Sequence, residues 1–260
     1  MRAQITINRS GITQASIGKT PPDGGAMARR INGDFQISLH RRASESALIN
    51  MMRALRAMDH ESRMTLHVGR LISEEMSCQE ICLQLSLRAL GAIERENEGQ
   101  VMSNLELYNS ENAQAAIKSG NLRRLADLSL AGKDAPAALM EVSAAKIKNL
   151  VSIRQSRSMR LYYLTQPKEV DWPANLPEIG VPLDEVASSS VSCRWLSILY
   201  EAAFAIRAPL FHHGFLRLAP GGMKPFQRII YPITPHIGKT SNHRILTVAE
   251  IVDNDTLVIV

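Results

Sequence analysis

The chain of 260 residues lacks the features that define several large classes of protein. Its three cysteines, Cys78, Cys82 and Cys193, form no CxxC pair and are too few for a disulfide framework. No apolar run reaches the roughly 20 residues of a transmembrane helix, and the N-terminus has no apolar signal-peptide core. We therefore expect a cytoplasmic protein without membrane spans. We also expect Cys78 and Cys82 to lie on one face of a helix and to pack in the protein core.

Proline and aromatic residues are scarce in the middle of the chain. Residues 45–158 hold Pro136 as their one proline and Tyr108 as their one aromatic residue. A stretch of this kind, rich in Ala, Leu, Met, Glu and Arg, favours helix. We predict a helical region over 45–130, whose apolar and Met-rich faces suit oligomerisation or the docking of a partner protein.

Apolar spacing and capping signals place individual helices within this region. Residues 61–75 are predicted as a second helix after the one that begins near Glu45. Ser77 and Glu80 have capping-box spacing and open a third, and Ser103 and Glu106 repeat the pattern and open a fourth. The apolar stripe of the first helix is Leu48, Met51, Met52, Leu55 and Met58, and that of the third is Ile81, Leu85, Ala89 and Ile93.

Positive charge is concentrated at the N-terminus. The formal net charge is +5, and the whole excess lies in residues 1–44, since acidic and basic residues balance in the rest of the chain. The segment also contains the turn signal "TPPDGG" and little apolar periodicity. We predict a basic, disordered arm over 1–44, with a short strand near Phe35–Leu39, that is a candidate for weak contact with nucleic acid, a membrane surface or an acidic partner.

The sequence pattern changes near residue 158. "SMRLYYLTQ" alternates as a strand does, a proline-studded loop follows, and "SCRWLSILYEAAFAIRAP" has helical spacing. Three strand-like segments then follow one another, "LFHHGFLRL", "PFQRIIYPIT" and "RILTVAEIV", and a turn leads into "TLVIV". The predicted fold class is α+β: a helical N-terminal region followed by an antiparallel sheet with covering helices.

The order of these C-terminal segments resembles that of a PAS-like sensor domain of the divergent proteobacterial group. The residues that carry the resemblance are "RLYYLT", "EIGVPLDEV", "YEAAFAIRAPLFHHGFL", "FQRIIYPIT" and "RILTVAEIV", within 160–258. The resemblance implies a PAS-like domain over 131–260 that senses a signal or binds a partner, and a homodimer formed through the flanking helices. A pocket in such a domain would be lined by Tyr162, Trp195, Tyr200, Phe204, Phe211, His212 and Phe226.

Catalytic and metal-binding patterns are not found. His212 and His213 are adjacent, and neighbouring residues of a strand point to opposite faces, so the two cannot chelate one metal. We expect one to face the sheet interior and the other solvent. "IGKT" occurs at 17–20 and 237–240, but neither copy has the small residue that a phosphate loop needs, separated by four residues from its Gly-Lys pair. We predict no enzyme, no catalytic residue and no required cofactor.

The sequence thus favours a non-enzymatic regulatory protein with a PAS-like sensor or interaction domain and a helical dimerisation region. The alternative is a DNA-binding transcriptional regulator that uses the basic arm and the helices of 45–100. Arg88 and Arg95 are the cations of the third predicted helix, which leaves few groups to contact phosphates or base edges.

Overall fold

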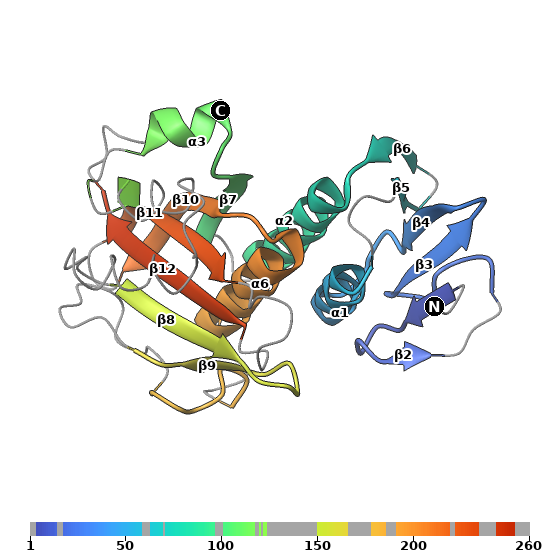
Figure 1. Ribbon diagram of the computed structural model, residues 1–260, viewed down its shortest axis with the longest axis horizontal. Helices are drawn as coiled ribbons and strands as arrows, with labels where there is room; N and C mark the ends of the chain where they lie inside the picture. The colour runs from blue at the N-terminus through green and yellow to red at the C-terminus, as the bar shows by residue number, and fades with distance from the viewer. Residues whose placement is uncertain are drawn as a thin grey trace. The chain divides into compact units, whose positions relative to one another are not determined.

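The computed structural model describes most of the chain as two compact units, Met1–Glu96 (unit 1) and Asn97–Val260 (unit 2). The described residues are 4–14, 18–58, 63–69, 71–96, 101–117, 120, 122–123, 150–165, 178–185, 191–218, 222–233 and 243–252. Within them lie two six-stranded sheets, one in each unit, and four helices (Figure 1). The predicted α+β class is therefore confirmed. No helix in these ranges is long and apolar enough to cross a membrane.

Unit 1 is built on a mixed sheet. Its elements are β1 (Gln4–Ile7), β2 (Thr13–Gln14), β3 (Ala26–Ile31), β4 (Asp34–Leu39), α1 (Glu45–Arg56), β5 (Met64–Val68), β6 (Leu71–Met76) and α2 (Cys78–Glu96). The strand order is β2-β1-β3-β4-β5-β6. The strands β4 and β5 are parallel, with α1 as the crossover between them, and the other neighbours pair antiparallel.

The prediction of a disordered arm over 1–44 is wrong, because this segment contains the strands β1, β2, β3 and β4. Asn32 and Gly33 have φ values of 53° and 102°, as a two-residue type I′ hairpin turn requires. Two of the basic residues there have partners within the sheet. Arg29 Nε donates to Gln36 Oε1 at 2.6 Å, and the guanidinium of Arg30 lies 5.7 Å from the ring centroid of Phe35.

The helices α1 and α2 confirm the predicted stripes. All residues of both stripes are buried, including Leu48, Met51 and Ile81. The capping box is formed, since Ser77 N donates to Glu80 Oε2 at 2.8 Å and Glu80 N donates to Ser77 Oγ at 3.2 Å. The hydrogen bonds that Ser77 N and Ser77 Oγ donate to the Glu80 carboxylate lower the pKa of Glu80. The three cysteines, Cys78, Cys82 and Cys193, are all buried, the first two in α2.

Two predicted helices of the 45–130 region are strands instead. Residues 64–68 and 71–76 form β5 and β6, and the buried Met64 and Leu66 alternate with half-buried Thr65 and His67, which is the period of a strand. The Ser103–Glu106 spacing lies within β7 (Val101–Leu107) and not at a helix start. The N-terminal part of the chain is thus not a helical region.

Unit 2 is built on an antiparallel sheet. Its elements are β7, α3 (Glu111–Ala116), β8 (Leu150–Gln155), β9 (Leu161–Tyr163), α6 (Val191–Ile206), β10 (Leu210–Leu218), β11 (Gly222–Ile233) and β12 (Arg244–Ile251). The strand order is β7-β10-β11-β12-β8-β9. The predicted succession of strand, helix and three strands is confirmed as β9, α6, β10, β11 and β12. "TLVIV" and the second "IGKT" lie outside the described residues.

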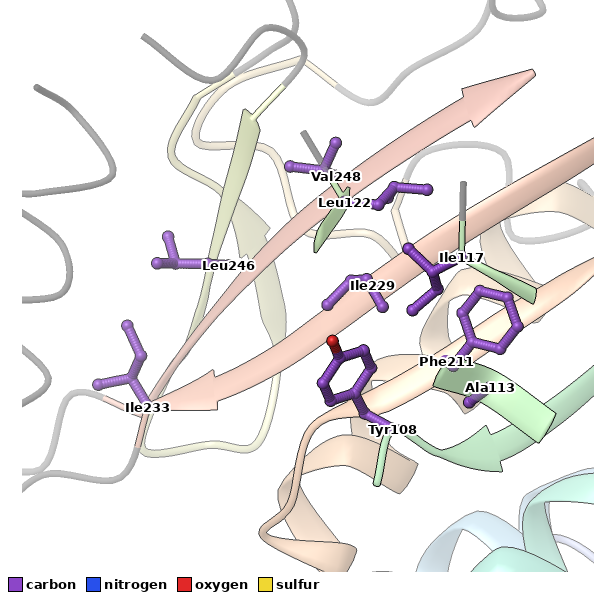
Figure 2. Close-up of a cluster of buried hydrophobic side chains, with 9 residues drawn as sticks. All are labelled: Tyr108, Ala113, Ile117, Leu122, Phe211, Ile229, Ile233, Leu246 and Val248. Atoms are coloured by element: carbon purple, nitrogen blue, oxygen red, sulfur yellow. The ribbon is translucent and has the colours of Figure 1, made fainter. Parts of the chain in front are cut away.

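Both faces of this sheet are covered. The long helix α6 packs on β11 from one side. The other side carries an apolar cluster from the segment after β7 and from β10, β11 and β12 (Figure 2). Its members are Tyr108, Ala113, Ile117, Leu122, Phe211, Ile229, Ile233, Leu246 and Val248. In the central strands β10, β11 and β12, neighbouring residues therefore point alternately toward α6 and toward this cluster.

Candidate functional site

The seven residues predicted to line a pocket divide between the two faces of the unit 2 sheet. Trp195, Tyr200, Phe204, His212 and Phe226 lie between α6 and the sheet. The other two, Tyr162 and Phe211, belong to the opposite face: Phe211 is part of the cluster in Figure 2, and Tyr162 alternates with Tyr163, which meets α6. Five of the seven are thus brought into one layer.

The centre of that layer is a group that we call the Trp195 cluster: Trp195, His212, Phe226 and Arg228. The Trp195 ring centroid lies 4.6 Å from that of His212 and 5.5 Å from that of Phe226, both edge-on, and the Arg228 guanidinium carbon is 5.3 Å from it. Trp195 Nε1 also donates to Ser103 Oγ on β7 at 3.3 Å. One α6 side chain therefore contacts three strands.

His212 is a polar member of this cluster whose ring has unused hydrogen-bonding capacity. Its side chain is fully buried, and it pairs directly with Arg228 on β11 and with Leu105 on β7. Neither ring nitrogen has a hydrogen-bond partner among the described residues. Burial, the charge of Arg228 and the neighbouring His213 hold the pKa of His212 well below its usual value. The ring is therefore neutral near pH 7 and offers one N–H donor and one acceptor nitrogen.

Other polar side chains beneath α6 are paired with one another. The hydroxyls of Tyr163 and Tyr200 lie 3.3 Å apart, and Gln155 Nε2 donates to Glu201 Oε1 at 3.0 Å. Burial raises the pKa of both tyrosines, so both keep their protons at neutral pH. Because most buried polar groups in proteins are hydrogen-bonded, the two ring nitrogens of His212 need an explanation.

His213 lies on the opposite face, as strand alternation requires. Its Nε2 is 3.1 Å from Glu106 Oε1, and its ring stacks on Phe211 with centroids 4.9 Å apart. The expectation that one of the two histidines faces solvent is wrong, since His213 is 6% exposed. The described residues contain no group of three or more His, Cys, Asp or Glu suited to a metal ion.

Sequence reasoning missed the charged and hydroxyl partners of this layer. Arg228 follows Gln227 in the middle of the apolar strand "FQRIIYPI", and both are buried. A buried polar pair in an otherwise apolar strand is a signal that could have drawn attention to β11. Tyr163 and Glu201 gave no comparable signal.

Comparison with protein-family models, curated proteins and solved structures found no match to this chain.

Proposed function

We propose that the chain is a non-enzymatic regulatory protein, and that unit 2 is a PAS-like sensor domain that holds a small molecule between α6 and the sheet. The observation that carries the proposal is His212, which is fully buried beside Trp195 and Phe226 with both ring nitrogens unpaired within the described residues. A bound molecule that supplies an acceptor and a donor would satisfy the imidazole.

The arrangement of elements supports the PAS-like assignment. The order β9, α6, β10, β11, β12 is the order on which the resemblance was drawn, and these strands pair antiparallel beneath one long helix. Five of the seven side chains expected to line a pocket lie on the α6 side. The strands β7 and β8 add to this pattern and extend the same sheet.

Contacts of Trp195 would couple the binding of such a molecule to the rest of the domain. It lies on the first half of α6 and contacts side chains from β7, β10 and β11. A molecule that binds His212 more tightly in one packing of α6 than in another shifts the population between the two. In this proposal, binding of the molecule is therefore transmitted as a change in the position of α6.

The test compares the protein as purified with the protein after bound molecules are removed. The full chain with Trp172→Phe, which leaves Trp195 as the single tryptophan, is denatured, dialysed and refolded. We expect the refolded protein to melt at a lower temperature with changed Trp195 fluorescence, and the dialysate to restore both. His212→Phe should abolish the effect of the dialysate, and His213→Phe should retain it. Refolded protein that is unaffected by the dialysate contradicts the proposal.

The predicted dimer interface has less support than the sensor. The Met-rich stripe of α1 and the stripe of α2 are buried, and Ser86 Oγ on α2 lies 3.1 Å from Met52 Sδ on α1, so the two helices pack on each other. Dimerisation through helices 45–130 would need another surface. Sedimentation at several concentrations measures it directly.

The alternative function, DNA binding, was predicted to use a mobile basic arm. Arg29 and Arg30 of that segment instead have partners within the sheet. Arg41 and Arg42 are exposed and remain the residues to test. A salt-dependent shift assay on the full chain, with Arg41→Ala and Arg42→Ala together as the comparison, separates this function from the sensor. Tight binding that weakens with salt and with the double variant would favour DNA binding.

A further inference from the structure

Two buried hydrogen-bond acceptors lie side by side on the face of the unit 2 sheet opposite α6. Gln227 and His213 are directly paired across β10 and β11, and they are 0% and 6% exposed. Gln227 Nε2 donates to the carbonyl oxygen of Ala116 at 2.7 Å. Gln227 Oε1 and His213 Nδ1 have no hydrogen-bond partner among the described residues. Each is an exception to the general pairing of buried polar atoms.

The contact with Glu106 determines which atoms of His213 donate. A carboxylate only accepts hydrogen bonds, so the hydrogen between Glu106 Oε1 and His213 Nε2 belongs to the imidazole. In the neutral ring Nδ1 is then a bare acceptor. Both unpaired atoms therefore require a donor, and they lie on adjacent strands, where paired side chains start about 5 Å apart.

The charge around this pair of acceptors is negative. Glu106 also accepts from Asn104 Nδ2 at 3.0 Å and from Ser110 Oγ at 3.1 Å, and no Lys or Arg in the described part of the chain forms an ion pair with it. The carbonyl of Ala116, the last residue of α3, adds a further acceptor. The group accordingly favours a ligand that is both a donor and a cation.

We propose that Glu106, His213 and Gln227 bind a small organic cation with a flat fork of N–H donors, an amidinium or guanidinium group. Two parallel N–H groups match Gln227 Oε1 and His213 Nδ1, and the positive charge faces Glu106. The Phe211 ring, stacked on His213 at an angle of 15°, adds an aromatic wall for a planar group. Glu106, with a side chain 20% exposed, marks where the group meets solvent. This site lies on the face opposite the proposed sensor site, so neither depends on the other.

Nuclear magnetic resonance of the histidine ring nitrogens tests the proposal on the full chain. The free protein should show His213 with hydrogen on Nε2 and a bare Nδ1. Benzamidinium should move the Nδ1 signal toward that of a hydrogen-bonded nitrogen, and the shift should saturate. Tetramethylammonium has the same charge without N–H groups, and benzoate has the same ring without donors, so neither should move it.

Variants assign the binding to these residues. Gln227→Leu and His213→Phe should each weaken benzamidinium binding at least about tenfold, a change that is readily measured by titration. His212→Phe, a change at the adjacent residue on the other face, should leave it unaltered. A free protein with hydrogen on both ring nitrogens, an Nδ1 shift that does not saturate, or an equal response to tetramethylammonium would overturn the proposal. Because the titration uses the wild-type chain, it decides the matter even where a variant fails to fold.

Discussion

His212 makes the stability of unit 2 depend on pH in a calculable direction. Its pKa in the folded protein is lowered by burial and by Arg228, whereas an exposed histidine titrates near about 6.5. The unfolded chain therefore binds a proton before the folded one does. Stability from this group is constant above about pH 6.5 and falls by up to about 1.4 kcal/mol for each pH unit below it.

Chemical denaturation of the wild type and of His212→Phe measures this effect. It is done between about pH 5 and pH 8, the range in which histidine side chains titrate. We expect the wild-type free energy of unfolding to decline toward acid, and the decline to be smaller in the variant by the contribution of His212. Equal slopes in the two proteins would show that His212 takes up its proton in the folded state.

His212 could be chosen from the sequence, but its surroundings could not. Strand alternation separated it correctly from His213. Its neighbours Trp195 and Arg228 come from a helix and from another strand, and their approach depends on the register of β10 with β11. A one-residue slip would exchange His212 for His213 under α6.

Among the secondary-structure elements, the pairing of β7 with β10 depends on Gly214. A Cβ atom there would collide with the carbonyl oxygen of Met102 and would lie 2.7 Å from Cα of Ser103. Gly214→Ala therefore forces the two backbones apart, and we expect a loss of about 1–3 kcal/mol of stability.

Gly91→Ala is the contrasting change, since the nearest neighbour of the added Cβ atom is the end of the flexible Arg95 side chain at 3.3 Å.

In the interior of α2, Gly91→Ala should stabilise unit 1 by roughly 0.5–1 kcal/mol. Thermal unfolding should show a loss of stability in Gly214→Ala and a gain in Gly91→Ala. Hydrogen exchange of the β7 amides shows whether Gly214→Ala acts on the pairing of β7 with β10. Unchanged protection of β7 in Gly214→Ala would contradict the close approach.

The type of an element could be predicted where a local sequence signal did not compete with strand pairing. The capping box at Ser77 opened α2 as expected, but the same spacing at Ser103 lies in a strand, because pairing with β10 overrode the local preference. In the N-terminal segment the Asn32–Gly33 pair was a strong hairpin signal. The basic composition of the segment is equally compatible with a disordered arm and with a sheet whose charged side chains face solvent.

On the scale of the whole molecule, each unit has its own sheet and core. Domains of this kind fold independently as a rule. We expect residues 1–96 and 97–260, produced separately, each to unfold cooperatively, and calorimetry of the full chain to show two transitions. Fragments that are both unfolded alone, with one transition in the full chain, would rule out two independent units.

The central claim is that the layer under α6 holds a small molecule, and native mass spectrometry of the purified full chain tests it most directly. We predict a species heavier than the polypeptide that loses the extra mass on denaturation, is absent from His212→Phe and is present in His213→Phe. The polypeptide mass alone in the native wild-type spectrum, or an extra mass that His212→Phe retains, would contradict the claim.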